Sequence, residues 1–302
     1  MVGIAFVGNT ATYAQYLDTG NFRGVTTVGT IELPILPDTT AVFHPDFSES
    51  VTRLVQTIDG ALPRSDSQLA ITLPYEMLVV SILTLDPSME PEDRSRFLQW
   101  EFEQRMDAKS DMYTSRFYPL KGHTGSEVLS VGMPKPLIPA LSKGAEHLDY
   151  TLISVEFDLL SSLPEVNSGE RDYILVKYSS HSVSCALLSG NTVNAAILMD
   201  RKDGKILRAC GSQTNRRQCT QAVQALENGE LFTLPKPCLV FGSQMPDAIR
   251  NVRGDSELCR LIRPFSWISD ENRRTILEGM GEGREFGAVS GLLHYQAGEA
   301  LG

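Results

Sequence analysis

Alternating and β-branched apolar positions open the chain and predict three consecutive strands. These strands are expected over residues 2–7, 11–18 and 22–33, with turn signals at Gly8-Asn9 and at 19–21 between them. Strands joined by such short turns pair with their neighbours in antiparallel fashion. The start of the chain is therefore expected to form a three-stranded meander.

Apolar residues then recur at helical spacing, and this change of period predicts the first helix. Val51, Leu54, Val55 and Ile58 lie at intervals typical of one helix face, which favours a helix over residues 47–62. A helix with one apolar face buries it against another element. We expect this helix to cover the sheet that the meander begins.

Two strands and an acid-rich helix follow. The strands are predicted over 68–73 and 79–85, and the acids at its start favour a helix over 90–106. The buried face of this helix is expected to carry three apolar residues, Phe97, Leu98 and Trp100. The next elements are predicted to be strands at 113–120, 127–133 and 151–155 and helices at 134–147 and 157–163.

A polar stretch rich in breakers, residues 164–171, is predicted to be a linker, and the opening pattern returns after it. The later elements are predicted to be strands at 173–178, 182–188, 193–199 and 237–241, a long helix within 204–227, a helix from Pro246 and a terminal helix containing 287–294. We therefore expect two halves, residues 1–163 and 172–302, with an inserted subdomain around 75–150 in the first.

The composition agrees with two core-forming domains and narrows the classes of function. The chain has 302 residues, 42% of them hydrophobic, and a formal net charge of −10 at pH 7. Such a chain repels a phosphate backbone, so no nucleic-acid partner is expected. No apolar run approaches the roughly 18 residues that a membrane helix needs, and the N-terminus lacks the basic region of a secretion signal. We expect a cytoplasmic protein without direct membrane insertion.

Cysteine and histidine positions indicate no metal site. The five cysteines form no Cys-x-x-Cys pair and are expected to be small buried hydrophobic residues. The histidines lack the spacing of a metal-binding motif. Residues 179–182, Ser-Ser-His-Ser, are interpreted as a hairpin turn, because neighbours in a strand point to opposite faces and cannot form a nucleophile and its base. No catalytic residue and no metal ligand is predicted.

Several segments of this chain resemble one known family. The resemblance is carried by residues 71–106, by Gly132-Met-Pro-Lys-Pro-Leu-Ile-Pro139, by Val155-Glu-Phe-Asp158 and by Gly287-Ala-Val-Ser-Gly-Leu-Leu293. Together they resemble the PilM-type actin-like proteins of type IV pilus assembly, which are related to the cytoplasmic region of GspL and to FtsA. The resemblance implies an α/β, actin-like (ribonuclease H-like) fold in two halves, with an inserted α+β subdomain in the first half.

In actin-like ATPases, two glycine-bearing hairpins direct backbone N–H groups at the phosphates, and acids on their strands hold magnesium through water. A glycine turn leaves space for a phosphate, and backbone donors form a fixed anion site. The resemblance places Gly8, Asn9 and Thr10 in the first hairpin as tentative nucleotide-binding residues. Phe6 stands where the family has an aspartate.

The second hairpin departs further from the family pattern. Alignment places Lys177 at the acid and Ser179 at the glycine, and the adenine-side motif retains only Gly242, followed by Ser243. A lysine repels a divalent cation, which favours a degenerate site. Two interpretations of Lys177 stay open: its side chain lies on the solvent face of its strand, or it replaces the metal and contacts a phosphate directly. The acids that a shifted alignment would bring close to the phosphates are Asp18, Asp172, Asp200 and Asp203.

The resemblance implies a non-catalytic cytoplasmic scaffold, a pseudo-ATPase that serves a type IV pilus or a related secretion machine. It would bind the N-terminal tail of an inner-membrane PilN-like protein in a groove of its first half, and so lie at the membrane through its partner. The alternative is an ATP-binding or ATP-hydrolysing member of the actin and sugar-kinase superfamily. No cofactor is expected, although ATP stays open as a ligand. Self-association into filaments is a further alternative.

Overall fold

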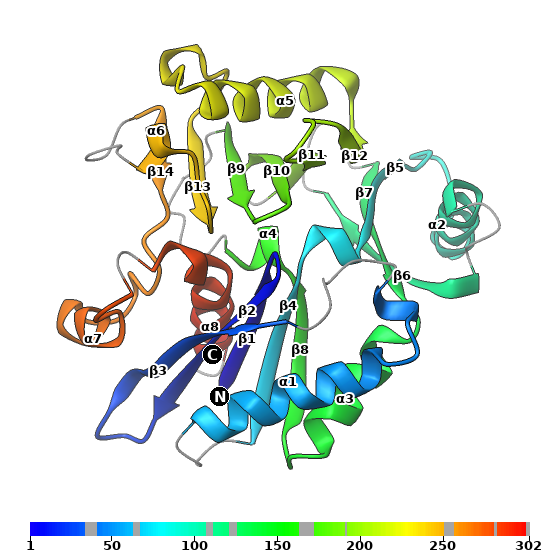
Figure 1. Ribbon diagram of the computed structural model, residues 1–302. Coiled ribbons are helices and arrows are strands. Elements are labelled where there is room, and N and C mark those ends of the chain that lie inside the picture. Colours follow the sequence, from blue (N-terminus) through cyan, green and yellow to red (C-terminus); the bar gives the residue numbers. More distant parts are fainter. Residues whose placement is uncertain are drawn as a thin grey trace.

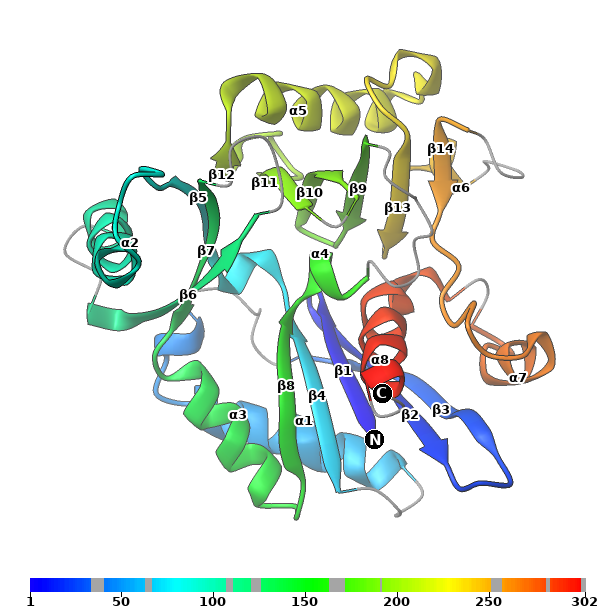
Figure 2. The same ribbon diagram turned by 180° about the vertical axis from the view of Figure 1, so that it is seen from behind.

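The computed structural model describes residues 1–33, 41–62, 67–106, 111–120, 126–162, 172–190, 192–250, 257–280 and 283–299. Within these residues the strands form three sheets, which Figures 1 and 2 show from opposite sides. The predicted linker, residues 164–171, lies outside the described residues.

The first sheet is built on the predicted meander. Its order is β3-β2-β1-β4-β8, from β1 (Val2–Val7), β2 (Thr10–Asp18), β3 (Arg23–Glu32), β4 (Gln68–Leu73) and β8 (Thr151–Phe157). Strands β1, β2 and β3 are antiparallel, whereas β1, β4 and β8 are parallel. Every residue of β1 is buried, as expected of a strand covered on both faces.

Helices cover both faces of this sheet. On one face lie α1 (Phe47–Ala61), with the predicted apolar stripe buried, and α3 (Leu137–Glu146). On the other face α8 (Gly287–Glu299) packs against β1 and β4 (Figure 2). A Cβ atom placed on Gly3 would lie 2.9 Å from Cγ2 of Val289, so a glycine in β1 lets α8 approach the sheet closely.

The inserted subdomain is a small sheet with one helix. Its strands, in the order β5-β7-β6, are β5 (Val79–Thr84), β7 (Glu127–Pro134) and β6 (Tyr113–Pro119), and its helix is α2 (Pro91–Met106). The prediction that Trp100 is buried is wrong, since 52% of this residue is exposed. The helix instead buries Leu98 and Phe102, which are four residues apart and therefore share one face.

The second sheet repeats the strand order of the first. Its order is β12-β11-β10-β9-β13-β14, from β9 (Asp172–Tyr178), β10 (Ser182–Ser189), β11 (Thr192–Asp200), β12 (Ile206–Gly211), β13 (Cys238–Gly242) and β14 (Cys259–Leu261). Strands β11, β10, β9, β13 and β14 thus correspond to β3, β2, β1, β4 and β8, with the same parallel and antiparallel pairings. Strand β12 is an additional edge strand.

The long helix predicted within 204–227 is present, but it is preceded by a strand that was not predicted. Residues 206–211 form strand β12, and α5 (Gln213–Asn228) begins only after Ser212. The hydroxyl of Ser212 accepts a hydrogen bond from the backbone N–H of Asn215 and so caps the helix, and Gly229 ends it in the left-handed conformation. The cap explains why the helix cannot extend into the preceding strand.

The end of the chain returns to the first half. The sequence assigned all of 172–302 to a second half, but α7 (Asp270–Ile276) packs on β3, and α8 packs on the first sheet. The remaining short elements are α4 (Asp158–Ser161), α6 (Asp247–Arg250), η1 (Ala41–Phe43), η2 (Tyr75–Met77), η5 (Leu231–Thr233) and η6 (Arg284–Phe286). Residues near the C-terminus therefore help to hold the halves together.

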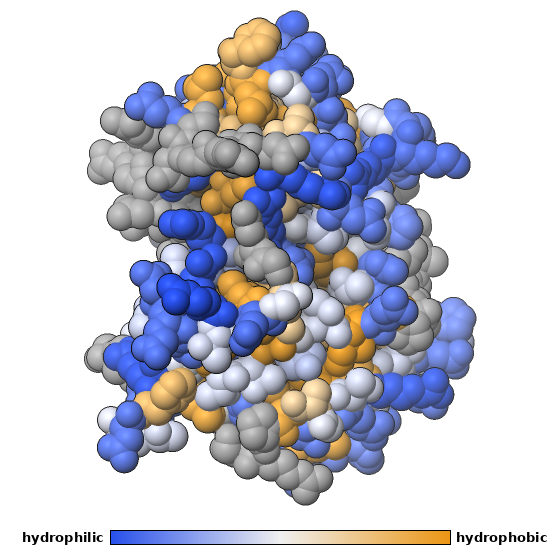
Figure 3. Space-filling view, turned by 60° about the vertical axis from the view of Figure 1, so that its left-hand side comes forward, coloured by the Kyte–Doolittle hydropathy of each residue, from blue (hydrophilic) through white to orange (hydrophobic). Residues whose placement is uncertain are grey.

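Burial confirms the interpretation of the cysteines. All five are buried and none forms a disulfide: Cys185, Cys210, Cys219, Cys238 and Cys259. No helix in the described part of the chain has the length and apolar character needed to span a membrane. On the face shown in Figure 3, apolar residues lie in several separate patches divided by hydrophilic ones, which is usual for a protein surface.

Candidate functional site

The first candidate hairpin joins β1 to β2 through a two-residue turn at Gly8 and Asn9. Val7 pairs with Thr10, and the Thr10 hydroxyl donates a hydrogen bond of 2.9 Å to the carbonyl of Val7. Gly8 has φ +64°, a conformation that glycine adopts at little cost. The turn therefore has the local geometry that the sequence predicts.

The second candidate hairpin joins β9 to β10 and is held by serine hydroxyls. The Ser179 hydroxyl lies 2.8 Å from that of Ser182 and accepts a hydrogen bond of 3.1 Å from the Ser182 N–H. The Ser179 N–H donates a hydrogen bond of 3.0 Å to the Ser182 carbonyl. The interpretation of residues 179–182 as a hairpin turn is confirmed.

The tips of the two hairpins touch. A Cβ atom placed on Gly8 would lie 2.5 Å from the Ser180 Oγ, 3.0 Å from the Ser180 N and 3.4 Å from the Ser179 Cβ. Contacts shorter than 3 Å essentially never occur at a real Cβ, so the glycine turn is filled by the opposite hairpin. A phosphate between these turns would have to displace one of them.

Lys177 connects the two halves beneath the turns. Only 1% of its side chain is exposed, and its Nζ donates one hydrogen bond of 2.7 Å to the Phe6 carbonyl and another to the carboxylate of Asp158. The interpretation that Lys177 lies on the solvent face is wrong, because its side of β9 faces Phe6 and Asp158 of the first half. The side chain of Phe6 is buried in the core, and its backbone carbonyl accepts the hydrogen bond from the lysine.

Asp158 supplies the countercharge. It begins α4, directly after β8, and its side chain is fully buried. Burial raises its pKa to about 6, and Lys177 acts in the opposite direction by favouring the charged form. Its Oδ1 has no hydrogen-bond partner among the described residues. The cation is thus already matched by a carboxylate of this chain.

Two further contacts close the junction on the side of the inserted subdomain. Glu76, in η2, accepts a hydrogen bond from the hydroxyl of Ser182. The guanidinium of Arg208, on β12, donates hydrogen bonds of 3.1 Å to the carbonyls of Tyr75 and Glu76 and a further one to that of Leu78. The second half is thereby hydrogen-bonded to the segment that connects β4 to β5.

The adenine-side motif also packs against the second hairpin strand. Gly242 has φ +106°, and a Cβ atom there would lie 2.1 Å from the carbonyl oxygen of Tyr178. The N–H of Ser243 donates a hydrogen bond of 3.0 Å to that same oxygen. Close strand packing therefore accounts for this glycine without a ligand.

The structure brings the predicted residues together from three separate segments. Gly8 contacts the turn after Lys177 and Tyr178, and Gly242 contacts Tyr178. That these residues bind a nucleotide stays a prediction. The sequence reasoning assigned no role to Asp158, Glu76 or Arg208, because their partners lie on segments distant in the chain. For Asp158 the signal was available: an acid placed directly after a predicted strand.

A groove lies elsewhere in the first half, between the starts of α1 and α3. Its cavity of about 360 Å³ is lined on one side by Phe43 and Phe47 and on the other by Pro136, Pro139 and Lys143. Apolar and proline side chains dominate it, and one lysine stands at its rim. Among the residues that the structure describes, no group of three or more His, Cys, Asp or Glu residues could hold a metal ion.

Two solved structures share this arrangement along nearly their whole length. A chain of a PilM–PilN type IV pilus biogenesis complex superposes with a TM-score of 0.65, covering 97% of each chain at 11% identity. This chain has the actin-like fold. The cytoplasmic domain of EpsL, an inner-membrane component of the type II secretion system of Vibrio cholerae, superposes with a TM-score of 0.50, covering 94% of this chain and 97% of that one at 9% identity.

A third match is a Bacteroides thetaiotaomicron protein described as having an actin-like ATPase fold and unknown function, with a TM-score of 0.46 and 11% identity over 92% of this chain and 95% of that one. Neither the protein-family models nor the curated protein sequences give a match to this chain. At such low identities the likeness establishes the actin-like fold, which confirms the fold class that the sequence resemblance implied.

Proposed function

We propose that this protein is a non-catalytic, actin-like scaffold of a type IV pilus or related secretion machine. The contact between the two hairpin tips carries the proposal, because actin-like ATPases need that space for phosphates. Two further observations support it: the buried Lys177–Asp158 pair occupies the junction beneath the tips, and the fold matches a chain of a PilM–PilN complex over 97% of each chain.

The partner that this proposal names is the cytoplasmic N-terminal tail of an inner-membrane PilN-like protein. The groove between α1 and α3 lies in the first half, and its apolar walls suit the side chains of an extended tail. Lys143 at the rim would pair with an acidic residue of such a tail. Capture of the tail would hold the scaffold at the cytoplasmic face of the inner membrane.

The tail-binding proposal is tested with a synthetic peptide of the PilN-like tail from the same organism, titrated into the full-length protein by calorimetry. We expect saturable binding that Phe43→Glu abolishes, since the change puts a charge into the apolar groove. The matched control is Phe232→Glu, because Phe232 is 81% exposed on the second half and belongs to no described groove. Equal binding by both variants would contradict the groove assignment.

The absence of catalysis is tested separately, by titrating ATP with and without magnesium and by measuring phosphate release. We expect no magnesium-dependent release. Magnesium-dependent hydrolysis would instead favour the ATPase alternative and would show that the hairpins separate in solution. Light scattering at high protein concentration checks for self-association, and filament growth with ATP would point to the same alternative.

A further inference from the structure

A larger cavity lies between the inserted subdomain and the second half. Its volume is about 700 Å³, and its lining includes Asp172 and Ser189, the residues at the ends of β9 and β10 opposite the hairpin turn. Strand β9 runs over seven residues from Asp172 at the cavity to Tyr178 at the turn, which corresponds to roughly 20 Å. The cavity is therefore distinct from the hairpin junction.

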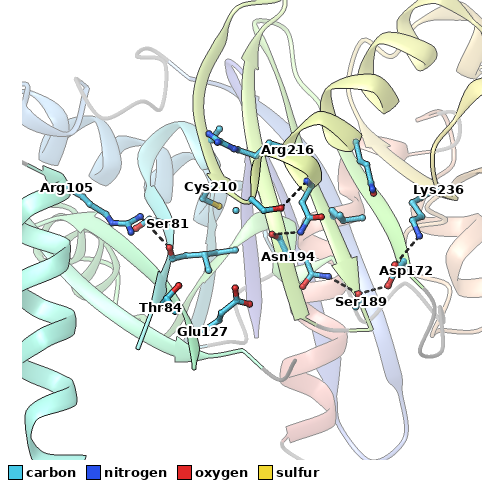
Figure 4. A pocket seen from close by; sticks show the side chains of 17 residues that line it. Ser81, Thr84, Arg105, Glu127, Asp172, Ser189, Asn194, Cys210, Arg216 and Lys236 are labelled. Carbon is cyan, nitrogen blue, oxygen red and sulfur yellow. Dashed lines mark hydrogen bonds and ion pairs between the residues drawn. The ribbon is translucent and has the colours of Figure 1, made fainter. Parts of the chain in front are cut away.

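Two separate units form the walls of this cavity (Figure 4). The inserted subdomain contributes Ser81, Ile82 and Thr84 from β5, Arg105 from α2 and Glu127 from β7. The second half contributes the ends of β10, β11 and β12 and the first turns of α5. A ligand here would contact both units at once.

The charged groups of the cavity differ in whether they already have a partner. Lys236 pairs with Asp172 at 3.1 Å, and Arg105 pairs with Glu101 at 3.5 Å. Arg216 is different: its Nε is buried and has no hydrogen-bond partner among the described residues. That nitrogen is closed to solvent, but Arg216 as a whole is only half-buried and lines the cavity, so an anion there would meet the outer N–H groups of its guanidinium.

The surroundings of Arg216 suit an anion with several oxygen atoms. In Figure 4, Arg105 comes from α2 of the inserted subdomain and Arg216 from α5 of the second half. Both lie in the upper part of the view, and Glu127 lies below them. Arg216 lies on the first turn of α5, a sixteen-residue helix whose N-terminus, capped by Ser212, lines the cavity. The positive end of the helix dipole adds to the two arginines.

The rest of the cavity offers neutral donors and acceptors together with a few apolar groups. The amide of Asn194 donates a hydrogen bond of 2.8 Å to the Ser189 hydroxyl, and that of Asn215 donates one of 3.4 Å to the Asn194 carbonyl. The side chains of Ser81 and Thr84 stand on the facing wall, and Ile82 lies between them in sequence. Hydroxyl and amide groups of this kind recognise sugar hydroxyls, and a volume of this size holds a drug-sized ligand.

We propose that this cavity binds a phosphate-bearing small molecule of nucleoside or sugar phosphate size, whose phosphate lies between Arg105 and Arg216. Arginine matches phosphate oxygens with two parallel hydrogen bonds, which lysine cannot do. The site does not depend on the scaffold function. A bound ligand would link the inserted subdomain to the second half and stabilise their present arrangement.

The test is calorimetric titration of the full-length protein with AMP, ATP and inorganic pyrophosphate, all without magnesium. We expect saturable binding that weakens as salt is added, with pyrophosphate competing for the same site. Arg216→Gln and Arg105→Gln should each weaken binding about tenfold or more, because each removes a charge-assisted contact. Arg217→Gln is the matched control, since Arg217 is the exposed neighbour of Arg216 on α5.

Hydrogen exchange then locates the ligand. Protection is expected in β5 and in the first turns of α5, and not in residues 7–10 or 179–182. Protection confined to the two hairpins would overturn the proposal, because it would place the nucleotide at the junction. Binding that both arginine variants retain, or no binding of any probe at millimolar concentration by a protein whose circular dichroism shows it folded, would also overturn it.

Discussion

The two hairpins at the junction share a topology but contribute different chemistry. The first, at Gly8-Asn9, contributes space and the backbone carbonyl of Phe6. The second contributes side chains: Lys177 fills the region beneath the turns, and the hydroxyls of Ser179 and Ser182 brace the tip. The first hairpin leaves room at a glycine turn, and the second occupies the region beneath the turns with a lysine side chain.

This difference shows how the two hairpins close the junction between the halves. A glycine turn is open only if nothing opposes it, and here Ser180 lies against Gly8. A buried lysine needs a countercharge, and Asp158 provides it from the end of β8. The junction is thus held by contacts within the chain, and its stability can be measured contact by contact.

The largest expected effect comes from removing the buried cation. Lys177→Met leaves the Asp158 carboxylate buried without its partner, and this should lower the free energy of unfolding by about 3–5 kcal/mol. Urea denaturation followed by circular dichroism measures it. The control is Lys236→Met, because the Lys236–Asp172 pair is partly exposed and its loss should cost at most about 1 kcal/mol.

A double variant sharpens this test. Lys177→Met combined with Asp158→Leu removes both charges and should recover most of the lost stability, as apolar replacement of buried pairs commonly does. Equal stability of the wild type and Lys177→Met would show that the pair does not hold the halves together.

The next effect concerns the glycine of the first hairpin. Gly8→Ala introduces a left-handed alanine and a Cβ 2.5 Å from the Ser180 Oγ, and should cost about 2–4 kcal/mol. Gly20→Ala is the matched control, because Gly20 has φ +77° but nothing within 4 Å of the added Cβ, and should cost only about 1 kcal/mol. If both variants lose the same stability, as thermal and urea unfolding would reveal, the hairpins do not touch in solution.

The third effect is a dependence of stability on pH that comes from Asp158. Its folded pKa of about 6 lies above the ordinary value of 3.8, so the native state binds a proton that the unfolded state has released. Stability should therefore fall as pH rises from about 4 to 6, by on the order of 3 kcal/mol, and level off above. Asp158→Asn should lack this component, so the difference between the two unfolding curves isolates it; a flat difference would contradict the assignment.

The smallest effect tests the second hairpin alone. Ser182→Ala removes the hydrogen bonds to Ser179 and Glu76 and should cost about 1 kcal/mol, while the first hairpin stays intact. Ser154→Ala is the control. It removes the hydrogen bond from the Ser154 hydroxyl to Glu156 of the same strand, and is expected to lower the free energy of unfolding by less. A larger loss of stability in Ser154→Ala than in Ser182→Ala would mean that the Ser182–Glu76 contact between the halves does not stabilise the protein.

Local pattern was sufficient for most of the elements, and for identifiable reasons. The strands at 2–7 and 68–73 and the helix at 47–62 were predicted because apolar period and turn residues are properties of neighbouring positions. The errors arose where local signals conflict. Residues 206–211 carry no clear period, and only pairing with β11 makes them a strand.

Trp100 shows the same limit on a helix. Its apolar side chain favours burial, yet the small sheet of the inserted subdomain covers only the face with Leu98 and Phe102. Which face of a helix is covered depends on the elements packed against it, and the sequence pattern of α2 is too weak to select one.

By itself the sequence determined that two similar α/β halves follow each other, that a glycine turn joins the first two strands of the first half and that a lysine precedes the corresponding turn of the second. Only the tertiary structure decided that the turns touch, that Lys177 pairs with Asp158 and that the final helix returns to the first sheet. The physical reason is that turns and periodicity act between neighbouring residues. Ion pairing and close packing act between atoms that the folded chain alone brings together.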